Sequence, residues 1–196
     1  MTDRLLAQLD FLRELDKAKN VLRQSHVTGT DRREDDAQHQ WHVAVMALLL
    51  AEHAAEPVDV GRVVAMLLLH DVVEIDAGDV FVYDEAAQAG KRAAEERAAD
   101  RLYGLLPPDQ GAWARELWEE YEAKATPEAR FAASIDRLQP LLQNLMTGGL
   151  GWRRNGVAAD RVLRLNSSME QGAPALWEHA RALLEQAVDD GVLPRE

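Results

Sequence analysis

The 196-residue sequence contains no cysteine. That absence excludes a disulfide framework and any thiolate chemistry, and it favours a cytoplasmic location. No apolar run approaches the ~20 residues that a membrane helix needs. The longest, VAVMALLLA, is bounded by His42 and Glu52. The N-terminal MTDRLLAQLDFLREL carries acids where a secretory signal has a basic start and an apolar core. We therefore expect neither a membrane span nor an export signal.

Basic residues are also scarce, with 22 Lys and Arg against 34 Asp and Glu and a net charge of −12. Nucleic-acid binding depends on Lys and Arg that neutralise phosphates, so we expect no nucleic-acid polymer as a partner. A small phosphorylated substrate is still compatible with this charge, because one local basic cluster or a metal ion can overcome the overall field.

The sequence also lacks strand alternation, internal repeats and low-complexity tracts, and helical periodicity dominates instead. Thr126 and Pro127 form a strong helix-start signature, as N-cap and first helical residue. Residues 23–38 and 148–156 are expected to be loops. We predict an all-α fold, one compact domain over residues 1–196 with seven or eight helices. The expected helices span about 3–18, 36–54, 58–71, 84–106, 106–123, 126–146, 158–168 and 173–190.

Two histidines lie at positions suited to a metal ion. His39 shares a helical stripe with Val43, Met46, Ala47 and Leu50, which places its imidazole on the apolar face. The alternative is a core histidine with a backbone partner. His70 follows an apolar run and is adjacent to Asp71, and such an imidazole–carboxylate pair suits Zn, Mn, Fe, Co or Ni. The alternative there is an exposed helix end with solvated acids.

Acidic residues complete the candidate site. Glu74 lies one turn after His70, on the same helix face. Asp136 lies beside the apolar stripe of its helix, and Pro140 removes the hydrogen-bond donor that its carbonyl would use, which predicts a bend. A salt bridge from Asp136 to Arg130 or Arg137 is the competing interpretation. Two histidines and two aspartates on three helices would leave coordination positions open for water, as catalytic sites do.

The order His, His-Asp, Asp resembles the HD superfamily of metal-dependent phosphohydrolases. Four blocks, over about residues 8–148, are similar to the HD-domain 5′-deoxynucleotidase group; residues 149–196 look like a helical extension. The blocks are FLRELDKAKNVLR, AQHQWHVAVMALLLAEHA, LLLHDVVEIDAGDV and LWEEYEAKATPEARFAASIDRLQPLL.

The resemblance implies roles for seven residues. One divalent ion (Mn, Co, Fe, Ni, Zn or Mg) would be held by His39, His70, Asp71 and Asp136. Glu74 would be the general acid or base, Asp79 an acid that contacts the sugar, and Arg23 a residue near the phosphate that helps to exclude a 2′-hydroxyl. The implied reaction is direct hydrolysis of a (deoxy)nucleoside 5′-monophosphate by a metal-activated water. A homodimer is also expected, because an aliphatic helix face is left over after the core is satisfied.

Two departures from the family pattern bear on these expectations. Gln38 stands where members have a glutamate before the first histidine, a residue that would tune the metal from behind its ligands. VFVYD follows Asp79 where the nucleotidases have a proline and a hydroxyl residue, which places substrate contacts in that segment in doubt. A different small phosphorylated substrate, or a metal-binding helical sensor or scaffold without catalysis, are the alternatives.

Overall fold

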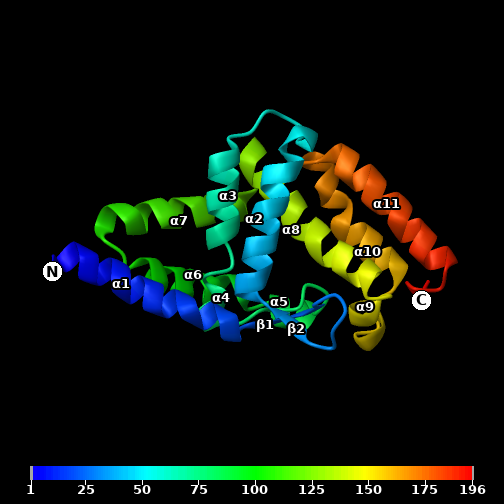
Figure 1. Cartoon of the computed structure of the whole chain (residues 1–196), viewed down its shortest axis with the longest axis horizontal. Helices are drawn as coiled ribbons and strands as arrows, with labels where there is room; N and C mark the ends of the chain where they lie inside the picture. Colours follow the sequence, from blue (N-terminus) through cyan, green and yellow to red (C-terminus); the bar gives the residue numbers. More distant parts are fainter. Residues whose placement is uncertain (1, 196) are drawn as a thin grey trace.

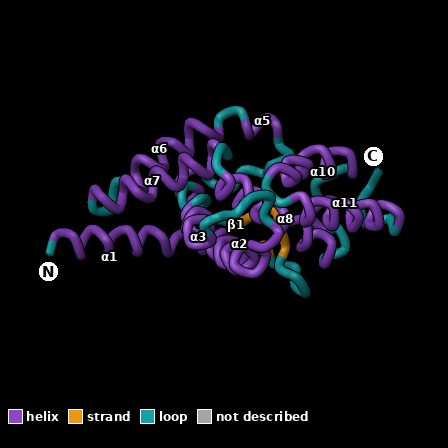
Figure 2. The backbone as a smooth tube through the Cα atoms, turned by 90° about the horizontal axis from the view of Figure 1, so that it is seen from above, coloured by secondary structure: helices purple, strands orange, loops and turns teal. Residues whose placement is uncertain are grey.

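The computed structural model describes residues 2–195, apart from the side chain of Glu85, and confirms a mostly helical fold. Within that range, eight α-helices have eight or more residues. They are α1 (Asp3–Leu15), α2 (Asp36–Leu50), α3 (Val60–Leu69), α6 (Lys91–Tyr103), α7 (Pro108–Ala123), α8 (Pro127–Met146), α10 (Ala159–Asn166) and α11 (Pro174–Asp189). Helices α2, α3 and α8 lie at the centre, with α1, α6 and α7 to one side and α10 and α11 to the other (Figure 1, Figure 2).

Shorter elements connect the long helices. They are the short helices α4 (Glu74–Ala77), α5 (Glu85–Gln88) and α9 (Leu150–Arg154), the 3-10 helices η1 (Asp16–Asn20), η2 (Ala51–His53) and η3 (Ser167–Gln171), and the strands β1 (Leu22–His26) and β2 (Arg33–Asp35). The prediction of one long helix over 84–106 is wrong in one respect, since α5 and α6 are separated at Ala89 and Gly90. The prediction of a loop over 148–156 is also wrong for α9, whose Trp152 is buried.

The sequence predicted a loop over residues 23–38, and this prediction is wrong. The segment forms most of an antiparallel hairpin that leads into α2. Strands β1 and β2 pair Leu22 with Asp35 and His26 with Arg33. Arg33 reinforces the pairing, because its guanidinium donates to the main-chain carbonyls of Leu22 and Arg23. Polar side chains at nearly every position conceal the alternation that marks a half-buried strand, so the pattern gave no signal.

Helix α2 begins at a capping box. Asp35 accepts a hydrogen bond from the Gln38 main-chain N–H at 2.9 Å, and the Gln38 side chain accepts one from the Asp35 main-chain N–H. This box fixes the start of the helix, and the stripe that begins at His39 is buried as predicted, with Val43 and Ala47 fully covered. His39 is therefore held in the core rather than on a mobile connection.

Helix α3 ends just before the His-Asp pair. A turn over residues 70–73 leads into α4, which stops at Ala77 because Gly78 adopts a φ of +78°. Helix α8 starts as predicted, with Thr126 accepting from the Ala129 N–H at 3.2 Å, and it continues through Pro140 to Met146. The ends of α3 and the middle of α8 thus face α2 across the centre of the molecule (Figure 1).

Two groups of buried apolar side chains support this arrangement. The larger one runs from Val43 on α2 to Leu193 beyond α11, so residues after 149 share a core with the motif-bearing helices. The smaller one joins Phe11 of α1 to α6 and α7, around Trp118. No helix in residues 2–195 has both the length and the apolar character required to cross a bilayer.

Candidate metal centre

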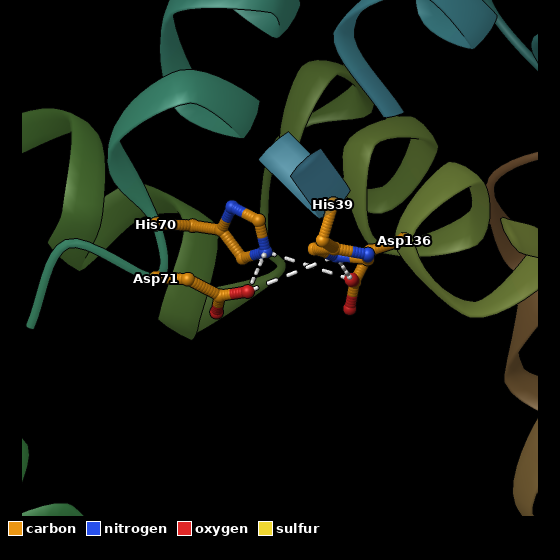
Figure 3. A group of neighbouring side chains, drawn as sticks. All are labelled: His39, His70, Asp71 and Asp136. Atoms are coloured by element: carbon orange, nitrogen blue, oxygen red, sulfur yellow. Dashed lines mark hydrogen bonds and ion pairs between the residues drawn. The ribbon is translucent and has the colours of Figure 1, made fainter. Parts of the chain in front are cut away.

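Four side chains from three helical segments converge at the centre of the fold. His39 comes from α2, His70 and Asp71 from the turn after α3, and Asp136 from α8 (Figure 3). One donor atom from each lies within 4.8 Å of all the others. The structure therefore brings together the four residues that the family resemblance assigned to a metal ion.

The donor atoms form a compact ring. His39 Nε2 lies 2.9 Å from Asp136 Oδ1 and 3.7 Å from Asp71 Oδ2. His70 Nε2 lies 3.1 Å from Asp71 Oδ2 and 3.5 Å from Asp136 Oδ1. Both imidazoles thus turn the same ring nitrogen toward both carboxylates.

Hydrogen bonds on the far side of each ring fix this orientation. His70 Nδ1 lies 3.0 Å from the Leu67 carbonyl, which can only accept a hydrogen bond, so Nδ1 is protonated. Nε2 is therefore the nitrogen that can bind a metal ion. His39 Nδ1 lies 3.1 Å from Gln139 Oε1, which acts in the same way. Partners of this kind set the tautomer of metal-binding histidines.

The competing interpretations of these residues do not fit the structure. His39 is fully buried, and its Nε2 faces two carboxylates rather than a backbone group. Asp71 is 9% exposed and does not lie on a solvated helix end. Asp136 pairs with the two histidines and accepts from Tyr121 Oη at 2.9 Å, whereas Arg130 pairs with Glu56.

The donor set fits a divalent cation. Burial alone would lower the pKa of His70, but Asp71 and Asp136 outweigh it and raise that pKa to about 10. Burial likewise opposes ionisation of Asp136, yet the two histidines hold its pKa well below the usual range. His70 Nε2 is buried and makes no hydrogen bond. Two imidazoles and two carboxylates are ligands for Zn, Mn, Fe, Co or Ni and leave positions open.

Glu74 begins α4 one turn beyond His70, and both residues line a cavity next to the cluster. It is 3% exposed, and its Oε2 has no hydrogen-bond partner. Burial first, and then the nearby Asp71, raise the pKa of Glu74 well above its usual value, while Arg23 at 3.8 Å opposes the shift. A raised carboxyl pKa next to a cavity is a property of general acids and bases.

A cavity of about 380 Å³ opens onto the cluster. His70, Asp71 and Asp136 contribute to its wall, and Asp79 also lines it. Burial raises the pKa of Asp79, although Arg23 opposes this. The volume is within the range of small-molecule sites. The rest of the wall includes Phe81, Tyr83, Lys91, Arg137, Asn144, Trp152, Leu165 and Asn166.

Arg23 reaches the cluster from strand β1. Its Nη1 lies 2.6 Å from Asp71 Oδ2 and 3.3 Å from Asp36 Oδ1, and its side chain is 13% exposed. The structure thus places Arg23, the arginine that the family resemblance assigned to the phosphate, beside Asp71. The hairpin, which sequence patterning did not predict, is what carries it there.

Sequence reasoning missed a buried acid behind His39. Glu34 of β2 accepts from Gln139 Nε2 at 2.9 Å and from Gln143 Nε2 at 2.8 Å, and its Oε2 lies 3.8 Å from His39 Nδ1. Gln38, by contrast, caps α2 and accepts from Arg32. The acid behind the first histidine therefore comes from position 34, and no helical or strand period links that position to the site.

The His-Asp pair at the junction of α3 and α4 and the mostly helical frame around it are those of an HD domain. The sequence matches the HD domain family over residues 15–177, and the chain belongs to this family. It is similar to a predicted metal-dependent phosphohydrolase from Magnetospirillum magnetotacticum MS-1, known from a crystal structure, with 53% identity, a TM-score of 0.93, and coverage of 97% of this chain and 96% of that one.

Curated relatives are more distant. 5′-deoxynucleotidase HDDC2 of Bos taurus is 35% identical over 136 residues, and that of Homo sapiens is 33% identical over 136 residues. Both matches cover 69% of this chain. The chain spans 65% of the length of these relatives.

Proposed function

We propose that this protein is a metal-dependent phosphomonoesterase that releases phosphate from (deoxy)nucleoside 5′-monophosphates. The observation that carries the proposal is the convergence of His39, His70, Asp71 and Asp136, the last three of which line a cavity that Glu74 also lines. Similarity to proteins named 5′-deoxynucleotidases and to a predicted metal-dependent phosphohydrolase supports the reaction class.

The cluster supplies the conditions for hydrolysis at neutral pH. A divalent ion held by these four residues would lower the pKa of a bound water from 15.7 toward about 7 and polarise a phosphoryl oxygen. The Leu67 carbonyl and Gln139 hold Nδ1 of each histidine, which leaves Nε2 as the nitrogen that can bind the ion. Tyr121 Oη donates to Asp136 Oδ2 and leaves Oδ1 directed at the histidines.

Glu74 is assigned the proton transfer. Its carboxyl lies in the same cavity wall as Asp71, and burial raises its pKa and favours its neutral form, as suits a group that exchanges protons with a substrate or water. The proton taken from the attacking water, or given to the departing sugar oxygen, would be held at this carboxyl. Retention of such a group argues against a purely structural metal site.

Arg23 and Asp79 are assigned to the substrate. A guanidinium matches the geometry of phosphate oxygens and can stabilise charge that develops on them. Asp79 is placed by the turn at Gly78 and faces the cavity, where its carboxylate can accept from a sugar hydroxyl. Arg23 lines the cavity 2.6 Å from Asp71, and we propose that it contacts the phosphate there and helps to exclude a 2′-hydroxyl.

The segment after Asp79 favours one alternative, which is a different small phosphorylated substrate. Phe81 and Tyr83 line the cavity, with ring centroids 5.2 Å apart in an edge-to-face arrangement. Phe81 and Tyr83 belong to the VFVYD segment, which differs from the nucleotidase pattern. The part of the substrate that is attached to the phosphate can therefore differ from that of the relatives.

A phosphate-release screen tests the proposed function. The wild-type chain is assayed with ribo- and deoxyribonucleoside 5′-monophosphates and with sugar phosphates, each in Mn²⁺, Co²⁺, Zn²⁺ and Mg²⁺. We expect metal-dependent release from at least one deoxynucleotide, lost in Glu74→Gln. Release from sugar phosphates alone would favour the alternative substrate, and no release at all would favour a non-catalytic metal-binding protein.

We further propose a homodimer. Seven large apolar side chains of α1, α2 and α3 are at least 42% exposed, and these helices lie on the same side of the molecule (Figure 2). They are Leu5, Leu6, Leu12, Trp41, Leu48, Leu49 and Leu68. A self-complementary apolar face of this kind is typical of a twofold interface. Sedimentation equilibrium should give a dimer for the wild type and a monomer for Trp41→Glu combined with Leu48→Glu.

A further inference from the structure

The cavity beside the metal-binding cluster continues along helix α8. Asp136, Arg137, Leu141 and Asn144 of this helix all line it. At about 1.5 Å of rise per residue, Asn144 lies about 12 Å further along the helix axis than Asp136. A phosphate held at the cluster would occupy only the Asp136 end. The remaining length can take the part of the substrate to which the phosphate is attached.

The wall of this further part is mostly apolar. Residues 80–83 after Asp79, residues 137–144 of α8, and helices α9 and α10 contribute to it, and we call it the distal wall. Helices α9 and α10 lie on the opposite side of α8 from α6 and α7 (Figure 1). The apolar members of the wall include Phe81, Leu141, Trp152, Val162 and Leu165. Flat rings with apolar faces, such as nucleobases, stack on aromatic side chains in sites of this kind.

Hydrogen bonds fix the distal wall. Asn144 and Asn166 each donate to the main-chain carbonyl four residues earlier, at 3.0 and 2.8 Å. Asn144 also accepts from the Trp152 main-chain N–H at 3.2 Å, and Asn166 hydrogen-bonds the Tyr83 hydroxyl. These bonds join α8 to α9 and α10 to the segment after Asp79, so both amides are engaged within the protein.

Arg137 differs from the two asparagines. It is half-buried and lines the cavity, and it forms no hydrogen bond or ion pair with any residue that the structure describes. Burial raises the pKa of the Tyr83 hydroxyl, whereas Asn166 and the positive charge of Arg137 oppose the rise, so the guanidinium lies near that hydroxyl. A guanidinium that loses hydration without gaining an acceptor is costly. Its place in the wall therefore points to a ligand that supplies acceptors.

The chemistry of a guanidinium determines which bases it can favour. It carries N–H donors and no acceptor, so it selects ligands by their acceptors. Guanine and hypoxanthine present two acceptors, O6 and N7, on one edge, and thymine and uracil present O4. Adenine and cytosine carry an amino group at the matching position. An amino group there would set donor against donor, and both would lose hydrogen bonds to water without replacement.

We propose that the distal wall binds the base of the substrate and that the Arg137 guanidinium selects keto bases over amino bases. This inference rests on the proposed nucleotidase function and names its preferred substrates, dGMP and dTMP over dAMP and dCMP. Arg137 follows Asp136 directly in the chain, but its guanidinium lies near Tyr83, so it acts on the base and not on the phosphate.

Pairs of nucleotides that differ at one position test the inference. dIMP and dAMP share a purine ring but carry a keto and an amino group at the same carbon, and dUMP and dCMP differ in the same way. In wild type with Mn²⁺, kcat/KM should be about tenfold or more higher for the keto member of each pair. In Arg137→Met, which keeps an unbranched side chain and removes its donors, both ratios should fall to within about twofold of one.

Two controls accompany this comparison. Arg97→Met is the matched variant, because Arg97 is exposed on α6 and does not line the cavity, and its ratios should equal those of wild type. Mn²⁺ affinity in Arg137→Met should match that of wild type, which would show that the neighbouring Asp136 is undisturbed.

Equilibrium binding measures the same selection without turnover. In Mn²⁺-loaded Glu74→Gln, calorimetry should show dIMP bound more tightly than dAMP, and the difference should disappear when Arg137→Met is added. Phe81→Leu removes an aromatic face but no donor, so it should weaken both nucleotides alike and leave their ratio unchanged. A ratio that changed in Phe81→Leu as it does in Arg137→Met would count against selection by the guanidinium.

The failure of this inference and that of the proposed function give different results. Equal kcat/KM for keto and amino nucleotides in wild type would overturn the inference and leave the proposed function in place. An equal fall for all four nucleotides in Arg137→Met would place the guanidinium at the phosphate and would also overturn the inference. Phosphate release from none of the nucleotides would contradict the proposed function itself.

Discussion

The three central helices and the β1–β2 hairpin contribute to the same site in different ways. Helices α2 and α8 and the turn after α3 place four donor atoms within 4.8 Å of one another, and the apolar stripes of the helices hold them there. The hairpin places Arg23 against Asp71 and Glu34 behind His39. The helices thus supply the groups proposed to bind an ion, and the hairpin supplies two charged side chains that lie directly beside those groups.

The largest expected effect is the loss of a donor from the helices. Asp136→Ala removes the carboxylate nearest His39 Nε2, and His70→Ala removes an imidazole with no substitute nearby. We expect metal affinity to fall by more than about 100-fold and phosphate release to be lost. This exceeds the loss of about 10–100-fold that is typical when a residue that only hydrogen-bonds a metal ligand is replaced. Calorimetric titration with Mn²⁺ measures the first. Asp160→Ala, an exposed acid on α10, is the control and should bind as wild type does.

Loss of Glu74 should separate binding from catalysis. Glu74→Gln keeps the shape of the buried side chain and removes its titratable proton, so metal affinity should stay within a few-fold while the rate of phosphate release falls by about 10²–10⁴-fold. Parallel titration and steady-state kinetics test this. A comparable loss in Glu119→Gln, whose carboxylate pairs with Arg115 at the surface, would show that the effect is not specific to the site.

These two predictions concern residues that sequence alone could place. His39, His70 and Asp136 lie on or beside helical stripes, and a period of 3.6 carries information about which side chains share a buried face. The family resemblance then joined the three helices. Arg23 and Glu34 lie on short polar strands whose burial depends on contacts with α8, over a hundred residues away in the chain. Local patterning cannot encode such a contact, so the hairpin and Glu34 could be found only from the structure.

Metal binding should depend on pH through His70. In the metal-free protein its pKa is raised from 6.5 to about 10, so the imidazole carries a proton that an incoming ion must displace. Affinity should therefore rise with pH, by about tenfold per unit below that pKa, with release of one proton per ion. The stability of the metal-free protein should change with pH in the opposite direction. The contribution of protonated His70 to the free energy of unfolding is complete below pH 6.5 and is lost as pH rises through about 10.

Calorimetry at pH 7 and 8 in buffers of different ionisation enthalpy measures both the affinity and the proton count. An affinity that is independent of pH would contradict the prediction. It would mean that His70 is already neutral in the metal-free fold, despite its contacts with Asp71 and Asp136.

The hairpin acid should have a smaller effect on the metal than the helix ligands. Glu34→Gln is isosteric and keeps an acceptor for Gln139 and Gln143, but it removes the negative charge 3.8 Å from His39 Nδ1. Because that charge favours a cation bound through Nε2 of the same ring, we expect Mn²⁺ affinity to fall by about 10–100-fold. Asp31→Asn, an exposed acid in the hairpin turn, is the matched control. Equal affinities in both variants would show that the charge of Glu34 has no specific effect on the ion.

The smallest effect is expected at Gln38, where family members have a glutamate. Gln38 Oε1 accepts hydrogen bonds from Arg32 Nη1 at 2.9 Å and from the Asp35 N–H. Gln38 therefore caps the start of α2 and, unlike Glu34, does not lie next to the His39 ring. Gln38→Glu keeps both bonds and adds a charge next to Arg32. Metal affinity should stay within about twofold, and the melting temperature should rise slightly, since an acid in the first turn favours the helix dipole by about 0.3–1 kcal/mol. A tenfold gain in affinity would instead show that position 38 acts on the ion, and that Glu34 does not hold that role alone.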